Sequence, residues 1–209
     1  MRIEQLPLPG SYVITPKAFD DDRGTFLEWF KQDLLAAELG HELELAQANW
    51  SVSRRGVVRG IHYADVPPGQ AKYVTCVRGA VLDVVVDLRV GSPTFGQHAA
   101  VELTADGERR AVYLSEGLGH GFCALTNDAT VLYLCSTGYD PTGEHGVDPM
   151  DPALDLPWPS DVVPALSAKD AAAPSLAEAR EAGALPTFEE CRAWTERLRT
   201  GAASAGSDR

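Results

Sequence analysis

The sequence predicts an all-β fold, a sandwich or barrel of short antiparallel strands with few helices. Between about 46 and 140, several runs alternate apolar with other residues, as half-buried strands do. Turn-forming groups separate these runs, among them Arg78-Gly79, Gly91-Ser92-Pro93 and Asp106-Gly107. Strands at this spacing are typical of a sandwich or barrel rather than of βαβ units.

The N-terminal segment is expected to hold short strands and one helix. Residues 20–24 (DDDRG) form a turn signal, and 25–30 (TFLEWF) follow as a strand. Residues 31–39 predict a short helix that stops at Gly40.

The central segment supplies most of the predicted strands, at 72–78, 81–88, 98–104, 109–114 and 129–137. The run 81–88 alternates most clearly. Leu82, Val84, Val86 and Leu88 share one face, while Asp83, Val85 and Asp87 share the other.

The C-terminal segment changes character after 150, where prolines indicate an irregular connection. Helices are predicted near 174–182 and 187–199. Thr187 and Glu190 form a capping-box pattern at the start of the second. The chain is predicted to form a single domain over 1–200, with a flexible tail over 201–209.

Charge and composition exclude several classes of function. The net charge of -12 argues against binding nucleic acid or anionic membrane, because a phosphate surface needs a basic patch. No apolar signal segment and no window of about eighteen apolar residues occurs, so a cytoplasmic location is expected. The four cysteines form no C-x-x-C pair and are predicted to be buried free thiols: Cys76, Cys123, Cys135 and Cys191.

Three groups able to carry positive charge, Arg59, His62 and Lys72, lie within fourteen residues of this acidic chain. Together they are suited to bind an anion. Strict alternation places Arg59 and His62 on opposite faces of a strand. The pattern therefore requires a β-bulge at Gly60.

Tyr133 and His120 each have two interpretations. Tyr133 is either a core tyrosine or a phenol that points into a barrel as a proton donor. His120 lies between two glycines, which predicts a tight turn that delivers its imidazole to a cavity. The five histidines form no H-x-H or H-E-x-x-H pair, so no metal site is predicted.

Six stretches of the chain, in order over about 170 residues, carry a resemblance to a known family. They are DDRGTFLEWF (21–30), QANWSVSRRGVVRGIHY (47–63), PPGQAKYVTCVRGAVLDVVVDLRVGSPTFGQ (67–97), YLSEGLGHGF (113–122), VLYLCSTGYDP (131–141) and LSAKD (166–170). They resemble the dTDP-4-dehydrorhamnose 3,5-epimerase family, and the resemblance implies a cupin-type β jelly roll that works as a homodimer.

The resemblance also implies roles for individual residues. His62 would be the general base with Asp170 as its orienting partner, Lys72 would lie near the C4 ketone oxygen, and Tyr133 would be the general acid on the opposite face. Tyr139 would stack on the thymine ring. The remaining implied contacts are Arg23, Phe26 and Glu28 with the nucleotide, across the dimer interface, and Gln47, Asn49, Arg59, His120, Glu144 and Lys169 lining the substrate site.

No metal or other cofactor is implied, because the H-x-H and acidic ligands of metal-binding cupins have no counterpart around His62 and Ala64. Two positions depart from the family pattern. Ala71 replaces a glycine, and Trp50 is bulkier than expected, which could alter the sugar pocket.

The implied reaction converts dTDP-4-keto-6-deoxy-D-glucose to dTDP-4-keto-L-rhamnose, with a 4-ketoreductase as the expected pathway neighbour. Three alternatives stay open. They are an epimerase of the same substrate at C3 only, for an antibiotic deoxysugar, a cupin that only binds nucleotide sugars, and a metal-dependent cupin isomerase or oxygenase.

Overall fold

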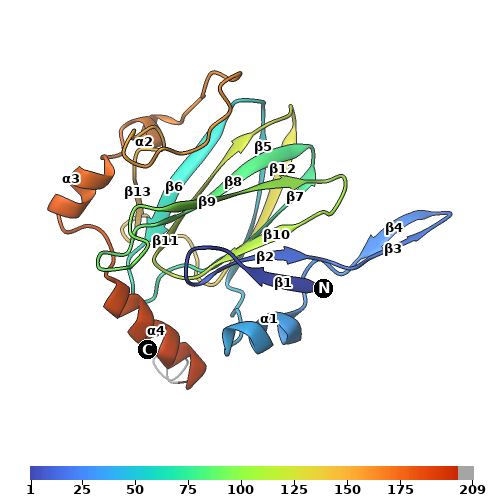
Figure 1. Cartoon of the computed structure of the whole chain (residues 1–209), viewed down its shortest axis with the longest axis horizontal. Coiled ribbons are helices and arrows are strands. Elements are labelled where there is room, and N and C mark those ends of the chain that lie inside the picture. The colour runs from blue at the N-terminus through green and yellow to red at the C-terminus, as the bar shows by residue number, and fades with distance from the viewer. Residues whose placement is uncertain (202–209) are drawn as a thin grey trace.

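A computed structural model describes residues 1–201 of the chain. Two antiparallel sheets pack face to face as a jelly roll, and a long β3–β4 hairpin projects from them (Figure 1). The first sheet has the order β1-β2-β10-β7-β12-β5 and the second the order β13-β6-β11-β8-β9. The all-β cupin-type prediction is therefore confirmed. The tail expected over 201–209 lies, apart from Gly201, outside the described residues.

The strands of the first sheet are β1 (Arg2–Gln5), β2 (Ser11–Thr15), β5 (Gln47–Ser53), β7 (Lys72–Arg78), β10 (Ala111–Leu114) and β12 (Ala129–Cys135). Those of the second are β6 (Val58–Ala64), β8 (Ala80–Asp87), β9 (His98–Thr104), β11 (Leu118–Ala124) and β13 (Glu144–Gly146). The hairpin comprises β3 (Ala18–Asp21) and β4 (Gly24–Leu27). The helices are α1 (Gln32–Leu39), α2 (Ala168–Ala171), α3 (Leu176–Glu181) and α4 (Phe188–Arg199).

Most predicted elements occur within two residues of their expected bounds. The strand expected over 25–30 is shorter, because β4 ends at Leu27. Helix α1 ends at Gly40, whose φ of 81° is the left-handed conformation that glycine adopts readily. Helix α4 begins with the predicted capping box. The Thr187 hydroxyl accepts from the Glu190 amide, and the Glu190 carboxylate accepts from the Thr187 amide.

The prediction of a tight turn around His120 is wrong. Residues 118–124 form β11, which pairs with β6 on one side and β8 on the other. Gly119 and Gly121 instead allow β11 to pack closely against its neighbours. A Cβ on Gly119 would lie 2.6 Å from Ile61 Cγ2, and one on Gly121 would lie 2.8 Å from the Arg59 carbonyl oxygen. Glycine at these positions lets β6 lie close to β11.

Apolar side chains fill both the interior of the jelly roll and a second layer outside it. Val74, Val85 and Phe122 belong to the cluster between the sheets. Val84 and Val86 face the other way and pack under the C-terminal segment. This second layer explains why β8 is apolar on both faces. The four cysteines are free and buried, as predicted.

Within residues 1–201, no helix is long and apolar enough to cross a membrane.

Candidate active site

One end of the jelly-roll interior is polar, and the first sheet supplies half of it. Lys72 lies opposite Cys135 in the register of β7 and β12, and Tyr133 lies opposite Val74. Directly opposed residues of an antiparallel pair point to the same face. Val74 belongs to the interior cluster, and Tyr133 packs against that cluster, so this is the inner face. Lys72, which alternates with Tyr73, lies on it too.

The second sheet supplies the other half through a β-bulge. His62 lies opposite His120, whereas Arg59 lies opposite Phe122, so β6 carries one residue more than β11 over this stretch. Gly60 has a φ of 120°, and a Cβ there would lie 2.5 Å from Gly121 Cα. The required bulge at Gly60 is confirmed, and it brings Arg59 and His62 to one face.

His62 forms a hydrogen-bonded pair with Asp170. Its Nε2 lies 2.7 Å from Asp170 Oδ1, and the Ser167 hydroxyl donates to the other carboxylate oxygen at 2.8 Å. Burial alone would raise the pKa of Asp170, but the hydrogen bonds from His62 and Ser167 outweigh it and hold that pKa below its ordinary value. Asp170 is buried, while the His62 side chain is 32% exposed and can meet a ligand.

A bridge between the strand region and the C-terminal segment positions this pair. Val57, just before β6, pairs with Ala165, and the Val58 amide donates to the Ala165 carbonyl. Ser167 then caps α2, because its hydroxyl accepts from the Asp170 amide at 3.0 Å. The cap fixes Asp170 on the first turn of α2.

Lys72 is buried and Tyr133 is partly buried. Burial lowers the pKa of Lys72, and the negative potential of Cys135, Glu144 and Asp83 opposes this effect. Burial raises the pKa of Tyr133, with Arg59 opposing it, so the phenol keeps its proton at neutral pH. Lys72 is suited to stabilise a nearby anion, and Tyr133 is suited to donate a proton.

A second histidine–carboxylate pair lies deeper in the interior. His120 Nε2 is 2.7 Å from Asp83 Oδ2, and both side chains are buried. Asp83 was not among the residues singled out from the sequence. The signal that could have found it is a carboxylate in the middle of an otherwise apolar, buried strand.

A hydrogen-bonded chain links the loop after β12 to the interior. The Tyr139 amide donates to Gln47 Oε1, Gln47 Nε2 donates to Asn49 Oδ1, and Asn49 Nδ2 lies 3.6 Å from Cys135 Sγ. The Tyr139 ring itself is exposed. Gln47 and Asn49 thus connect the interior strands to Tyr139, the residue expected to stack on the thymine ring.

Three further expected residues lie around the same end. Arg59 Nε donates to Ser53 Oγ at 3.1 Å, and Glu144 accepts from Gln70 Nε2 at 3.3 Å. Lys169 precedes Asp170, and its charge helps to lower the pKa of that carboxyl.

Arg23, Phe26 and Glu28 lie away from the other expected residues within one chain. Arg23 and Phe26 are on the projecting hairpin (Figure 1), where Arg23 pairs with Asp21 and Phe26 is 67% exposed. Glu28 follows the hairpin and lies 3.6 Å from Lys31. A single chain does not bring these three residues to His62.

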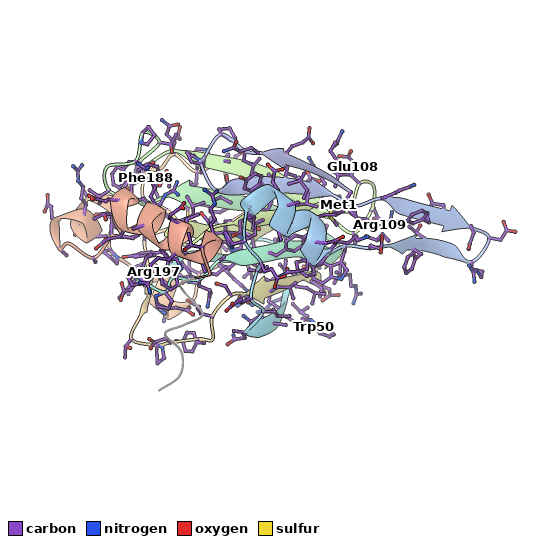
Figure 2. The ribbon with its side chains drawn as sticks, turned by 90° about the horizontal axis from the view of Figure 1, so that it is seen from below. Met1, Trp50, Glu108, Arg109, Phe188 and Arg197 are labelled. Carbon is purple, nitrogen blue, oxygen red and sulfur yellow. The ribbon has the colours of Figure 1, made fainter. Side chains whose placement is uncertain are left out.

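Trp50 does not line the site, contrary to the expectation that it could alter the sugar pocket. It alternates with the inward-facing Asn49 on β5 and is 72% exposed (Figure 2). Its partner across β12 is Leu132, on the outer face of the sheet. Because side chains alternate along β5, the Trp50 indole points away from the side chains of the candidate site.

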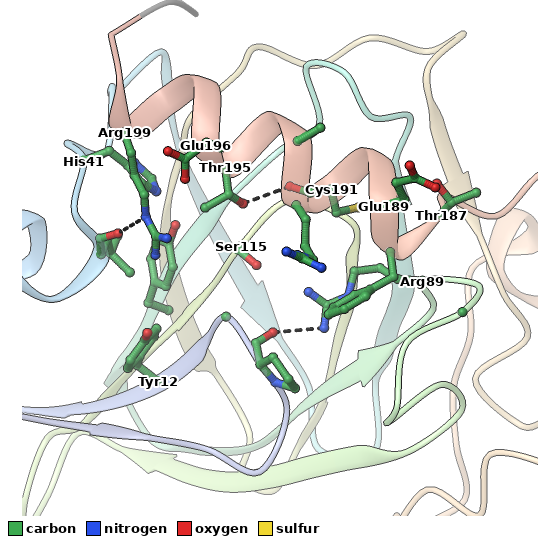
Figure 3. Close-up of a pocket in the computed structure, with 18 of the residues that line it drawn as sticks. Tyr12, His41, Arg89, Ser115, Thr187, Glu189, Cys191, Thr195, Glu196 and Arg199 are labelled. Carbon is green, nitrogen blue, oxygen red and sulfur yellow. Dashed lines mark hydrogen bonds between the residues drawn. The ribbon is translucent and has the colours of Figure 1, made fainter.

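A pocket of about 1200 Å³ contains none of these side chains. It lies between α4, the β1–β2 turn and the loop after β8 (Figure 3). Two of its cations are already engaged: the Arg89 guanidinium donates two hydrogen bonds to Asp87, and Arg199 donates to the Leu39 carbonyl. This groove is separate from the polar end of the interior around His62.

No three His, Cys, Asp or Glu side chains in residues 1–201 are grouped so as to hold a metal ion. The absence of a metal from the reaction stays a prediction.

The chain is similar to known proteins over most of its length. Residues 5–178 match the family described as dTDP-4-dehydrorhamnose 3,5-epimerase. A Streptomyces niveus dTDP-4-dehydrorhamnose 3-epimerase is 60% identical over 93% of each chain. A Mycolicibacterium smegmatis dTDP-4-dehydrorhamnose 3,5-epimerase is 55% identical over 95% of this chain and 98% of its own.

A solved structure is similar over nearly the whole chain. It is ChmJ, a 3'-monoepimerase from Streptomyces bikiniensis in complex with dTDP-quinovose, at a TM-score of 0.92 and 48% identity over 94% of this chain and 99% of its own. Together with the jelly roll and the sequence relatives, this similarity shows that the chain belongs to the dTDP-4-dehydrorhamnose 3,5-epimerase family.

Proposed function

We propose that this dTDP-sugar epimerase inverts both C3 and C5 of dTDP-4-keto-6-deoxy-D-glucose and yields dTDP-4-keto-L-rhamnose. The observation that carries the proposal is the His62–Asp170 pair, which lies at the same end of the interior as Lys72 and Tyr133. Base, cation and acid are thus held on separate strands around one space. No metal or other cofactor takes part in the proposed reaction.

The first step is removal of a proton from a carbon next to the ketone. The C4 ketone acidifies the hydrogens on C3 and C5, because the resulting carbanion delocalises as an enolate. A histidine titrates ordinarily near about 6.5, so a neutral imidazole is available at neutral pH. Asp170 holds one ring nitrogen of His62, which leaves Nδ1 as the nitrogen for the substrate.

Lys72 stabilises the charge that develops on the C4 oxygen. It lies on β7 facing the interior and is largely excluded from water. A cation in a water-poor cavity acts strongly on a nearby anion, and it is in place before the reaction begins. Electrostatic stabilisation of this kind takes the role that a metal plays in other cupins.

Tyr133 returns a proton from the opposite side. It projects from the first sheet, whereas His62 projects from the second. Inversion needs a donor on the face away from the base. A phenol that is protonated at neutral pH, because burial raises its pKa, fits this requirement.

We infer that the nucleotide is bound by residues of two chains in a homodimer. Arg23 and Phe26 belong to the hairpin that projects from the sheets, and Phe26 and Trp50 are exposed apolar side chains of the kind found at interfaces. Arg23 of one chain would neutralise the diphosphate in its partner's site, while Tyr139 stacks on thymine. Sedimentation equilibrium that gives a monomer mass would contradict this arrangement.

A C3-only epimerase is the second candidate, favoured by the name of the relative that is 60% identical, a 3-epimerase. Both reactions use the same base and cation. They differ in whether a proton is exchanged productively at C5. Either product retains the 4-keto group, so a 4-ketoreductase is the proposed next enzyme, and we place both steps in the cytoplasm.

The deciding experiment is incubation with dTDP-4-keto-6-deoxy-D-glucose in deuterated water, followed by reduction and identification of the sugar by NMR. Deuterium at both C3 and C5 with an L-rhamno product supports double epimerisation. Deuterium at C3 alone supports the second candidate, and no exchange at either carbon contradicts both. Activity that disappears with chelator and returns with a divalent metal would contradict the metal-free mechanism.

A further inference from the structure

The loop over residues 136–143 connects β12 of the first sheet to β13 of the second and carries Tyr139. Residues 138–142 of this loop are exposed to solvent. An exposed loop moves unless other groups hold it, and ordering a mobile loop costs binding free energy. The position of Tyr139 therefore depends on what holds the two ends of the loop.

Gln70 contacts both ends of this loop through one nitrogen atom. Its Nε2 donates to the Thr137 carbonyl at 3.2 Å and to Glu144 Oε1 at 3.3 Å. Thr137 lies two residues before Tyr139, and Glu144 begins β13 directly after the loop. Glu144 pairs with Ala64 of β6, so the link runs from the segment before β7 in the first sheet to the second sheet. Gln70 is buried, so water competes little for these hydrogen bonds.

The two partners of Gln70 require an amide rather than a carboxylate. A backbone carbonyl only accepts hydrogen bonds, and so does an ionised glutamate. The NH2 group of a glutamine offers two N–H donors, one for each acceptor. A glutamate of the same shape would direct an oxygen at both acceptors instead.

The segment around Gln70 is itself fixed to the first end of the loop. Ala71 and Ser136 exchange two hydrogen bonds of 2.8 and 3.0 Å, and the Thr137 hydroxyl donates to the Gly69 carbonyl at 2.9 Å. These contacts continue the pairing of β7 with β12 beyond the ends of both strands. Gln70 therefore reaches across to the second end of the loop from a segment that is held in place.

We propose that Gln70 is a positioning residue, which holds the loop of Tyr139 and the Glu144 carboxylate in the geometry that binds the nucleotide sugar. Its role lies in binding rather than in proton transfer, because its two partners are a backbone carbonyl and a residue expected to line the substrate site. The inference rests on the proposed function for the roles of Tyr139 and Glu144. The link itself is a property of the free protein and can be measured without substrate.

The first test measures backbone hydrogen exchange in the full-length protein without ligand. Gln70→Met removes both donors and keeps the length of the side chain, so the amides of residues 138–143 should exchange about tenfold faster or more. Ser136→Ala is the matched control, because it removes a hydrogen bond between the same two segments and leaves the link to Glu144. Its exchange should change by less than about threefold. If Gln70→Met lacks the wild-type circular dichroism spectrum, Gln70→Leu repeats the test.

The second test separates binding from turnover. In Gln70→Met, the Kd of dTDP by calorimetry and the KM of the keto sugar should each rise about tenfold, while kcat stays within about threefold of wild type. Gln70→Glu should weaken binding at least as much at neutral pH, because its carboxylate faces that of Glu144.

Acid provides a rescue that a merely structural role would not show. In mildly acidic buffer, the carboxyl introduced by Gln70→Glu takes up a proton and regains a donor. The ratio of its Kd for dTDP to that of wild type should therefore fall toward one. The same ratio for Gln70→Met, which shares every other titrating group, should stay constant.

Three results would overturn the proposal. Exchange over residues 138–143 that is as slow in Gln70→Met as in wild type would show that this side chain does not hold the loop. Equal effects in Ser136→Ala would assign the order of the loop to the strand ends. A fall in kcat with unchanged Kd and KM would place Gln70 in the chemical step. If the wild-type enzyme exchanges no deuterium into the keto sugar, the proposed function fails, and hydrogen exchange of the free protein still decides whether Gln70 holds the loop.

Discussion

The molecule holds two histidine–carboxylate pairs with the same 2.7 Å separation and very different surroundings. In the pair of His62 with Asp170, the imidazole is 32% exposed and both carboxylate oxygens accept hydrogen bonds. In the pair of His120 with Asp83, the imidazole is 8% exposed and one carboxylate oxygen has no partner among the described residues.

The difference makes the pair of His62 with Asp170 the better suited of the two to the proposed proton transfer. A base needs access to its substrate and a carboxylate that stays ionised while the imidazole gains and loses a proton. Ser167 and the cap of α2 give Asp170 that stability. The pair of His120 with Asp83 is buried and lacks that access. Distance alone would not have distinguished the two pairs.

The largest expected effect separates the two imidazoles. His62→Asn should lower kcat by about 10³-fold or more, because it removes the general base. His120→Asn should lower it by only about tenfold, because His120 is expected to line the substrate site and not to act as the base. Turnover is measured by deuterium incorporation under single-turnover conditions. Equal losses of kcat in the two variants would contradict the different roles of His62 and His120.

The next effect concerns the carboxylate of the exposed pair. Asp170→Asn should lower kcat by about 10²-fold, because an amide favours the wrong imidazole tautomer and cannot stabilise the imidazolium. Its KM should change little, since Asp170 contacts His62 rather than solvent. Steady-state kinetics at pH 7.5 tests both parameters. A rise in KM with unchanged kcat would assign Asp170 to substrate binding instead.

A smaller effect is expected from the residue that supports Asp170. Ser167→Ala removes one hydrogen bond to the carboxylate, so the pKa of Asp170 should rise toward its ordinary value and kcat should fall by about three- to tenfold. Ser167→Thr keeps the hydroxyl and serves as the control. If Ser167→Thr loses as much activity as Ser167→Ala, the effect comes from packing at the helix cap.

The smallest effect is a pH dependence of stability. The pKa of folded Asp170 lies below its unfolded value, so its hydrogen bonds contribute stability that is present above about pH 4 and lost as pH falls through the folded pKa. Urea unfolding at several pH values should therefore show wild type losing its advantage over Asp170→Asn in acid. A difference that stays constant down to pH 2 would contradict this linkage.

Much of the fold could be predicted from the sequence, because alternation and turn chemistry are local. The run 81–88 and the capping box at Thr187 both appear in the structure. The error at His120 has a physical cause. Glycine is permissive, and a glycine that avoids a cross-strand clash looks in the sequence like a glycine that makes a turn.

The site could be predicted in part. The bulge at Gly60 followed from the requirement that Arg59 and His62 share a face. The hairpin that carries Arg23 and Phe26 is placed by the tertiary arrangement. The outward direction of Trp50 depends on which residues of β5 face the interior. Asp83 was missed because a buried charge is recognisable only once its burial is known.

The bridge from Val57 to Ala165 has a consequence for the order in which this enzyme matures. Every strand of the described chain ends by Gly146, whereas Asp170 arrives more than twenty residues later. A nascent chain can thus complete its sheets before its base has a partner. Under the proposed mechanism, His62 gains its orienting partner only when the final quarter of the polypeptide docks, so a chain truncated before Asp170 is expected to lose turnover.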